Sequence, residues 1–300
     1  MLHCTALHCS QPPASATRDI ILEVPPTVFD PQEAYSWNYD PAFASRGWPY
    51  CTVTVPDHSD GDVQIAAEYV VNAVRSLHAQ SGRQVELIGW SQGASTSPRW
   101  ALRWWPDIRP MVASLVGIAP DNEGGGNVAA PVCGLECVPA VWQEVKRING
   151  DPPHFITAMN SLRQTFPGIA YTDIYSYTDE LAGLNITTTP VSPLPAAANV
   201  LNVAEQQICP LQPFEHLTIL ASSVVYAVAM AALAAPGSLP HLAAIDTNAV
   251  CSDPLMPFVT AVSLMSNEAS LIAEVPGRLT TGMVTSEPPL KCYVTDSCLR

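Results

Sequence analysis

Short apolar segments alternate with helical segments between Asp19 and Ser176, and this alternation constrains the fold most strongly. Five segments have the apolar, β-branched character of buried strands: Asp19–Val24, Tyr50–Val55, Val85–Gly89, Val112–Ile118 and Ala170–Ser176. Apolar residues recur at helical spacing in Val63–His78, and Ala94–Trp105 is a second expected helix that Pro106 ends. Strands that alternate with helices favour the α/β class, with a mostly parallel sheet covered by helices on both faces.

The rest of the chain gives no sign of a second domain. No repeat of fixed period and no long Gly/Ser or charged linker divides the 300 residues, of which 48% are hydrophobic. We therefore expect a single domain over residues 1–300, in which 1–18 is an irregular N-terminal segment. Val224–Ala235 and Pro257–Ala273 are expected apolar helices, and each is a candidate for the core or for a pocket wall, although most apolar helix faces simply pack.

Charge and hydropathy exclude several kinds of partner. The net charge of −14 argues against nucleic acid and against electrostatic docking to anionic lipid. Met1–Arg18 has no apolar run long enough for a secretory signal, so either a signal lies upstream or the protein stays inside the cell. Leu217–Ala235 is largely apolar, but hydroxyl residues interrupt it, so we expect a buried helix and no transmembrane segment.

The nine cysteines are scattered along the chain. They form no paired C-x-x-C clusters near histidines, so we expect no metal site. Wide scatter favours a few disulfides in an oxidising compartment over buried reduced thiols. The odd number leaves at least one thiol unpaired or paired between chains.

A nucleophile motif lies between an expected strand and an expected helix. Gly89-Trp90-Ser91-Gln92-Gly93 matches G-x-S-x-G. A sharp strand-to-helix turn lifts such a serine hydroxyl out of the sheet, and the glycines let strand and helix approach closely. The backbone N–H of Gln92 would then face a developing oxyanion, next to the positive end of the helix dipole. The motif therefore predicts Ser91 as a nucleophile.

A serine hydroxyl needs a base, and the base needs an acid that orients it. For a serine at such a turn, the chain order is serine, acid, histidine. His216 lies in a loop before an apolar helix, whereas His241 follows Pro240 in an Ala/Pro-rich stretch typical of a surface. Asp179 follows the last expected strand, at the sheet edge where functional side chains gather, although Asp also favours turns and N-caps. We expect Asp179 as the acid and His216 as the base.

These motifs resemble those of fungal lipases of the lipase B type, in the α/β-hydrolase family. The resemblance runs from about Cys9 to Cys298. It is carried by six segments: Ile88–Gly93, Trp105–Arg109, Ala119–Asp121, Val141–Gln143, Tyr175–Glu180 and Phe214–His216. The resemblance implies a triad of Ser91, Asp179 and His216 and an α/β-hydrolase fold.

The resemblance also implies roles for residues around the triad. Thr27 and Gln92 would donate to the oxyanion. Trp90 would floor the pocket for the alcohol side of an ester, and Asp121 and Gln143 would line the acyl side. No metal and no organic cofactor is implied.

Three disulfides are supported by the resemblance: Cys9–Cys51, Cys209–Cys251 and Cys292–Cys298. Cys133 and Cys137 have no counterpart, so a local bridge and free thiols both stay open, and Cys4 is left over. We expect a secreted, monomeric protein whose partner is a small-molecule or lipid ester, with transient contact with a lipid interface left open.

The oxyanion loop departs from the family pattern. In Val24-Pro25-Pro26-Thr27-Val28-Phe29-Asp30, Pro26 and Val28 stand where glycines are expected, and the loop is about one residue shorter. Proline and a β-branched residue restrict the backbone angles with which Thr27 can present its donors. The loss of one such donor typically costs ~10²–10³-fold in rate. Phe29 is a candidate for narrowing the entrance.

The sequence therefore predicts a carboxylic ester hydrolase, a lipase or esterase acting in lipid degradation, that works through an acyl-enzyme, with transesterification as a further reaction. Two alternatives stay open. One is a catalytically weak or silent relative that binds a lipid or a hydrophobic metabolite, which the unusual Pro26–Phe29 loop supports. The other is a biosynthetic acyltransferase or lactonising enzyme, since an alcohol can replace water in a dry pocket.

Overall fold

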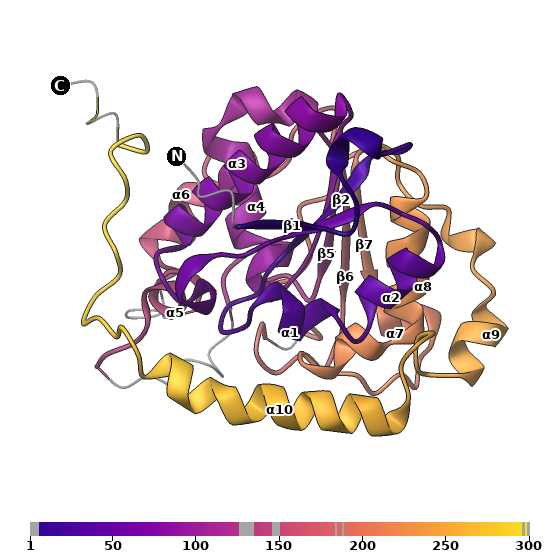
Figure 1. Cartoon of the computed structure of the whole chain (residues 1–300). Helices are drawn as coiled ribbons and strands as arrows, with labels where there is room; N and C mark the ends of the chain where they lie inside the picture. The colour runs from indigo at the N-terminus through magenta and orange to yellow at the C-terminus, as the bar shows by residue number, and fades with distance from the viewer. Residues whose placement is uncertain are drawn as a thin grey trace.

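The fold is built on one twisted sheet with helices on both of its faces (Figure 1). A computed structural model describes residues 6–125, 135–145, 151–183, 185–187, 189–295 and 298. Within these residues the sheet has seven strands in the order β1-β3-β2-β4-β5-β6-β7. The strands are β1 (Leu7–Cys9), β2 (Ile20–Val24), β3 (Tyr50–Val53), β4 (Val85–Trp90), β5 (Val112–Ile118), β6 (Ala170–Tyr175) and β7 (Val200–Ala204). All neighbouring pairs are parallel except β1 and β3, as the alternating sequence pattern predicts.

The helices pack in two layers, and the side chains of the strands alternate between them. Ile20, Leu22 and Val24 of β2 join the core on one face of the sheet, and Ile21 joins the core on the other. The first core includes residues of α3 (Val63–Ser81), α4 (Thr96–Trp104), α5 (Pro139–Glu144) and α6 (His154–Asn160). The second includes residues of α1 (Pro31–Tyr35), α2 (Tyr39–Ser45), α8 (Ser223–Leu233) and α10 (Ala261–Leu279). Two short helices complete the set, α7 (Glu205–Ile208) and α9 (Thr247–Ser252).

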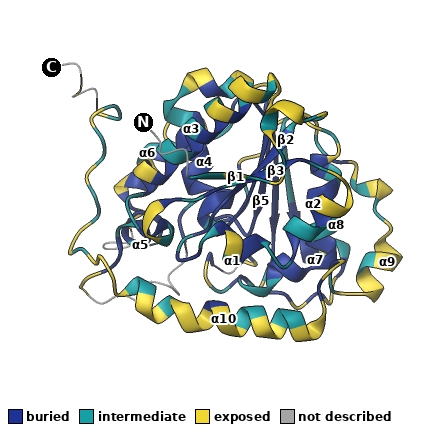
Figure 2. Ribbon diagram, viewed as in Figure 1, coloured by how far each residue is buried: buried dark blue, intermediate teal, exposed yellow. Residues whose placement is uncertain are grey.

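The two apolar helices of the second half have different environments. α8 is almost entirely buried and belongs to the core, whereas α10 lies along the edge of the molecule with most of its length exposed (Figure 2). Leu271 is the buried residue of α10, and Val262 and Met265 are 78% and 69% exposed. In the part of the chain that the structure describes, no helix combines the length and the apolar character needed to cross a bilayer.

The N-terminal segment is more regular than the sequence predicts. Residues 7–9 form β1, which pairs with β3 in a register that places Cys9 opposite Cys51. The Cys9–Cys51 disulfide joins the two strands at this pair. The short strand is stabilised by this covalent link and by its backbone hydrogen bonds to β3, and neither can be predicted from the local hydrophobic pattern. The expectation of an irregular segment over residues 1–18 is therefore wrong for this part of it.

The other disulfides agree with those that the sequence implies. Cys209–Cys251 and Cys292–Cys298 are both formed, so the three expected pairs are confirmed. Cys137 is also disulfide-bonded, which excludes a free thiol at this position. Cys4 and Cys133 lie outside the described residues.

Candidate active site

Ser91 lies on a tight turn at the carboxyl end of β4. Its φ is 56°, in the left-handed region, and the turn leads through a 3₁₀ segment (Ser91–Ala94) into α4. A Cβ on Gly89 would lie 2.0 Å from the carbonyl oxygen of Gly93, and a Cβ on Gly93 would lie 2.1 Å from that of Val24. Only glycine fits at either position, so the two glycines of the motif allow strand, turn and helix to approach this closely.

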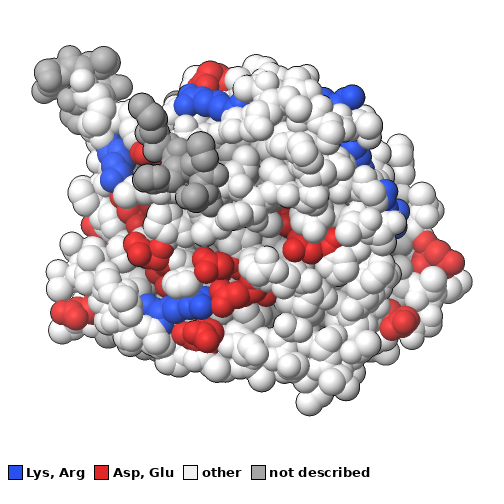
Figure 3. Space-filling model, viewed as in Figure 1, with Lys and Arg blue, Asp and Glu red and all other residues white. Residues whose placement is uncertain are grey.

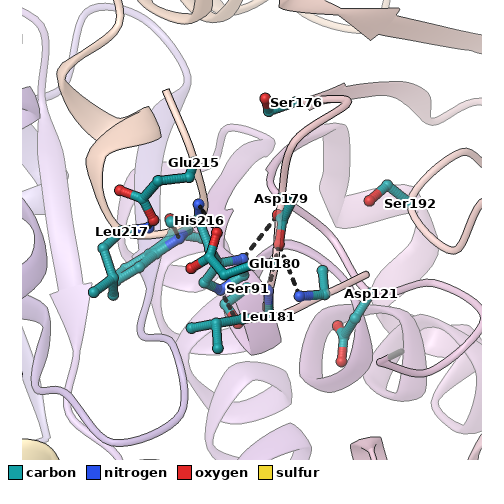
Figure 4. A network of polar contacts seen from close by, with 12 residues as sticks. Ser91, Asp121, Ser176, Asp179, Glu180, Leu181, Ser192, Glu215, His216 and Leu217 are labelled. Carbon is teal, nitrogen blue, oxygen red and sulfur yellow. Dashed lines mark hydrogen bonds and ion pairs between the residues drawn. The ribbon is translucent and has the colours of Figure 1, made fainter. Parts of the chain in front are cut away.

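His216 bridges the serine and a buried acid (Figure 4). Its Nε2 is 3.1 Å from Ser91 Oγ, and its Nδ1 is 2.8 Å from Asp179 Oδ2. The three side chains come from loops after three different strands, and Asp179 and His216 are only 0% and 5% exposed. The geometry thus joins hydroxyl, imidazole and carboxylate in one hydrogen-bonded chain.

The surroundings of Asp179 fix its orientation. Its Oδ1 accepts hydrogen bonds from the backbone N–H groups of Leu181 (3.0 Å) and Ala182 (2.8 Å), which leaves Oδ2 for the imidazole. The indole N–H of Trp90 donates to the carbonyl oxygen of His216 at 3.0 Å and holds the histidine loop. Burial alone would lower the pKa of His216, but the adjacent Asp179 carboxylate outweighs it and the pKa is raised. A raised pKa makes the imidazole a stronger base.

Thr27 and Gln92 lie next to each other because they follow neighbouring strands. Thr27 follows β2 and Gln92 follows β4, and these two strands are paired in parallel. The side-chain Nε2 of Gln92 donates to Thr27 Oγ1 at 2.8 Å and to the carbonyl oxygen of Ser59 at 3.0 Å. The N–H of Gln92 lies in the first turn after the nucleophile, where helical N–H groups have no partner within the helix. Thr27 lines the same pocket as Ser91, and Gln92 directly follows Ser91 in the chain.

The oxyanion loop has a strained backbone, in line with the sequence departure. Val28 has φ +78°, a conformation that β-branched residues rarely adopt. Such residues cost on the order of 1–3 kcal/mol and persist where their surroundings hold them. Here the carbonyl oxygen of Val28 accepts a 2.6 Å hydrogen bond from Arg278 of α10, which also forms a two-pronged ion pair with Glu33. Figure 3 shows basic atoms among acidic ones on the face above α10.

An apolar pocket of about 390 Å³ opens over Ser91 and His216. Trp90 forms part of its wall, and the ring of Phe29 stacks on Trp90 with 5.8 Å between centroids. α10 contributes four apolar residues to the lining: Ile272, Val275, Pro276 and Leu279. The sequence predicted an apolar helix here but ended it at Ala273, so it missed the three of these residues that follow that position.

Asp121 lines the pocket, but Gln143 does not. Asp121 is 5% exposed, its carboxyl contacts the Ser95 hydroxyl, and burial raises its pKa. Gln143 points away from the pocket, accepts a hydrogen bond from the backbone N–H of Val63 at 2.8 Å and donates to Asp62 at 2.7 Å. The assignment of Gln143 to the acyl side is therefore wrong.

Helical geometry explains the difference. Residues three and four apart share a face of a helix, so Val141 of α5 faces the pocket together with Glu144 and Val145. Gln143 is two positions from Val141 and projects from another face. The spacing of three residues from Val141 would have identified Glu144. The motif Val141-Trp142-Gln143 ends one residue before it.

One further cluster consists of residue types that can bind a metal ion. Among the described residues, Asp30, Glu33 and His58 place one ligand atom each within 4.8 Å of one another. Glu33 is ion-paired with Arg278, and His58 Nδ1 lies 3.0 Å from Asp30 Oδ2. These groups are thus partnered by each other and by Arg278, and they lie outside the pocket lining.

Comparisons with known proteins agree with the geometry. No protein-family model matches the chain. Lipase B of Pseudozyma antarctica is 29% identical over 272 residues, which are 88% of this chain and 77% of the relative. Aspergillus fumigatus lipase B superposes with a TM-score of 0.86 at 24% identity, over 96% of this chain and 70% of that one. The mature form of Bacillus licheniformis lipase BlEst2 matches with a TM-score of 0.50 at 13% identity, over 71% and 92%.

These comparisons confirm two expectations. The chain is similar in sequence to a fungal lipase B, which confirms the resemblance carried by the motifs. It also has the fold of lipases of this type, which confirms the α/β-hydrolase fold expected from the alternating pattern.

Proposed function

We propose that this protein is a carboxylic ester hydrolase of the lipase or esterase kind, with Ser91 as nucleophile, His216 as base and Asp179 as the acid that orients it. The observation that carries the proposal is the continuous chain of hydrogen bonds from Ser91 through His216 to Asp179 at the floor of an apolar pocket. The names of its relatives, lipase B in two fungi, support the same activity.

The proposed reaction has two halves. Ser91 Oγ attacks the ester carbonyl carbon while its proton passes to His216 Nε2, and Asp179 stabilises the resulting imidazolium. The carbonyl π electrons move to oxygen, and the backbone N–H groups of Thr27 and Gln92 stabilise that oxyanion. The imidazolium then protonates the leaving alcohol as the acyl-enzyme forms. Water then attacks the acyl carbon while His216 takes its proton. The bond between the acyl carbon and Ser91 Oγ breaks, the imidazolium returns the proton to Oγ, and the acid leaves.

The pocket lining indicates the substrate class. Trp90 and Phe29 are apolar and flat, and the α10 residues are aliphatic, so an ester with an apolar acyl chain or a bulky apolar alcohol fits best. In our proposal Trp90 floors the alcohol side and Asp121 lies on the acyl side. The largely apolar lining offers water few polar contacts, so an added alcohol can replace water as the acceptor of the acyl group. We therefore expect transesterification as a further reaction.

Further features support proposals about the cellular setting. Disulfides suit an oxidising compartment, so we propose that the protein is secreted. We further propose that it acts as a single-domain monomer, without cofactor or metal. Exposed apolar residues of α10, Val262 and Met265, support transient contact with a lipid interface.

The test compares the native protein with Ser91→Ala on p-nitrophenyl esters of graded acyl length. We expect hydrolysis by the native protein and only background hydrolysis by Ser91→Ala, with equal circular dichroism spectra. A fluorophosphonate probe should label the native protein and not the variant. Absence of both turnover and labelling in folded native protein would instead favour a silent, lipid-binding relative.

A further inference from the structure

Glu144, the last residue of α5, is a buried carboxyl group that reaches the pocket. It is 3% exposed and lines the pocket together with Thr27 and Ser91. Its Oε2 lies 2.7 Å from Thr27 Oγ1, and its Oε1 contacts the hydroxyl of Thr96. None of the steps described above uses this acid, yet it touches a residue assigned to the oxyanion.

The hydroxyl of Thr27 has only one hydrogen to donate, and the protonation state of Glu144 determines where that hydrogen points. Gln92 Nε2 is a donor only, so Thr27 Oγ1 is the acceptor in their 2.8 Å contact. If Glu144 is a carboxylate, it holds no proton, and the hydrogen of Thr27 must point to Oε2. The hydroxyl is then unavailable to a substrate oxygen.

A protonated Glu144 reverses this arrangement. The acid proton on Oε2 donates to Thr27 Oγ1, while Oε1 stays the acceptor of the Thr96 hydroxyl. The other acceptor of Thr96, the carbonyl oxygen of Gln92, is at 3.4 Å, which favours this assignment. Thr27 Oγ1 then accepts two hydrogen bonds, and its own hydrogen takes the remaining tetrahedral direction, away from both partners.

The surroundings favour the protonated acid at neutral pH. Burial is the main cause, and the nearby Asp121 carboxyl adds to it, while the hydrogen bonds from Thr96, Thr27 and Gln92 oppose it; the pKa of Glu144 is raised to about 8. Asp121 in turn faces His216 and the buried Arg99.

We propose that Glu144 is a positioning residue that, while it carries its proton, turns the hydroxyl of Thr27 towards the substrate oxyanion. Thr27 then supplies a hydroxyl donor in addition to the two backbone N–H groups. Deprotonation of Glu144 withdraws that donor. This inference rests on the proposed ester hydrolysis and adds to it a proton-dependent control of the oxyanion site.

The main test is the pH dependence of kcat on p-nitrophenyl butyrate, with Ser91→Ala subtracted as background. Because Glu144 loses its proton as pH rises, native kcat should fall above about pH 8, by ~10²-fold if one donor is lost. Glu144→Gln keeps a neutral donor to Thr27, so it should retain the neutral-pH rate and lose the alkaline fall. Thr27→Val should be slow at neutral pH and also lack the fall.

Two controls separate this inference from other causes. Glu68→Gln changes a carboxyl on α3 outside the pocket and should keep the native profile. Asp121→Asn should shift the alkaline fall but not remove it. An alkaline fall that survives in Glu144→Gln, or an inactive but folded Glu144→Gln, overturns the inference while Ser91-dependent hydrolysis by the native protein still stands.

A second measurement does not depend on activity. Other buried acids, such as Glu86, also have a pKa raised to about 8, so the native protein is compared with Glu144→Gln. The spectrum of the native protein minus that of Glu144→Gln should contain the carbonyl band of one protonated carboxyl group, which disappears as pH rises through about 8. If this difference spectrum has no such band near pH 6, Glu144 is already ionised and the inference fails, whether or not the protein hydrolyses esters.

Discussion

Replacement of Asp179 by Asn changes one atom of the candidate triad and keeps its volume. In the native protein Oδ1 accepts two backbone hydrogen bonds, from Leu181 and Ala182, and Oδ2 faces His216 Nδ1 at 2.8 Å. An Asn side chain must place its oxygen at one of these positions and its NH₂ group at the other. The backbone decides which orientation is favoured.

The structure allows the preference to be estimated. An NH₂ group facing Leu181 and Ala182 would leave two buried N–H donors unsatisfied, at about 1–3 kcal/mol each. The Asn oxygen therefore stays with the backbone, and its NH₂ group donates to His216 Nδ1. That fixes the imidazole proton on Nε2, the atom 3.1 Å from Ser91 Oγ, which can then no longer accept the serine proton. In serine hydrolases this tautomer error lowers kcat by ~10⁴-fold, which is about 5.4 kcal/mol.

The assay is p-nitrophenyl ester hydrolysis near neutral pH by the native protein and Asp179→Asn, with Ser91→Ala as background. Because the two side chains have equal volume, we expect equal circular dichroism spectra and the loss in kcat rather than in KM. A folded variant with kcat within about tenfold of the native value would refute the assignment of Asp179, since the tautomer argument requires a far larger loss.

Two further predictions concern the elements that hold the site. Gly93→Ala places a Cβ 2.1 Å from the carbonyl oxygen of Val24, so the melting temperature should fall by roughly 2–6 °C, whereas Gly277→Ala, with open space around it, should leave it nearly unchanged; equal melting temperatures for both variants would contradict the packing argument. Arg278→Met removes the hydrogen bond to Val28 and the ion pair with Glu33, so we expect a loss of about 1–2 kcal/mol in denaturant unfolding and a several-fold lower kcat. The matched variant Arg75→Met, which breaks the exposed ion pair with Asp107, should change neither, and an unaffected kcat in Arg278→Met would argue against support of the oxyanion loop by α10.

The central sheet could be predicted because each buried strand is a local apolar run. The expected segments Val112–Ile118 and Val85–Gly89 agree with β5 and β4 to within one residue. The two outer strands, β1 and β7, were missed for a physical reason. Each lies at an edge of the sheet and pairs on one side only. β1 has only three residues, none of them buried, so it lacks the continuous apolar pattern of a central strand. β7 is as apolar as β2, but so short a run does not by itself distinguish a strand from a helical segment.

The candidate site could be predicted where a residue type and chain order define the chemistry, as for Ser91, Asp179 and His216. It could not be predicted where the direction of a side chain determines whether the residue belongs to the site. Gln143 and Glu144 are neighbours in sequence, and only the rotation of α5 determines which one faces the pocket. The contact between Arg278 and Val28 joins residues 250 positions apart, and no local sequence pattern predicts it.

The most direct test of the central assignment is to locate the covalent adduct of a fluorophosphonate probe by peptide mass spectrometry. We expect one phosphonylated site, at Ser91, formed rapidly in the native protein and extremely slowly in folded His216→Ala, because His216 Nε2 is the base that accepts the serine proton. An adduct on another residue, or labelling of Ser91 at an undiminished rate in His216→Ala, would contradict the account.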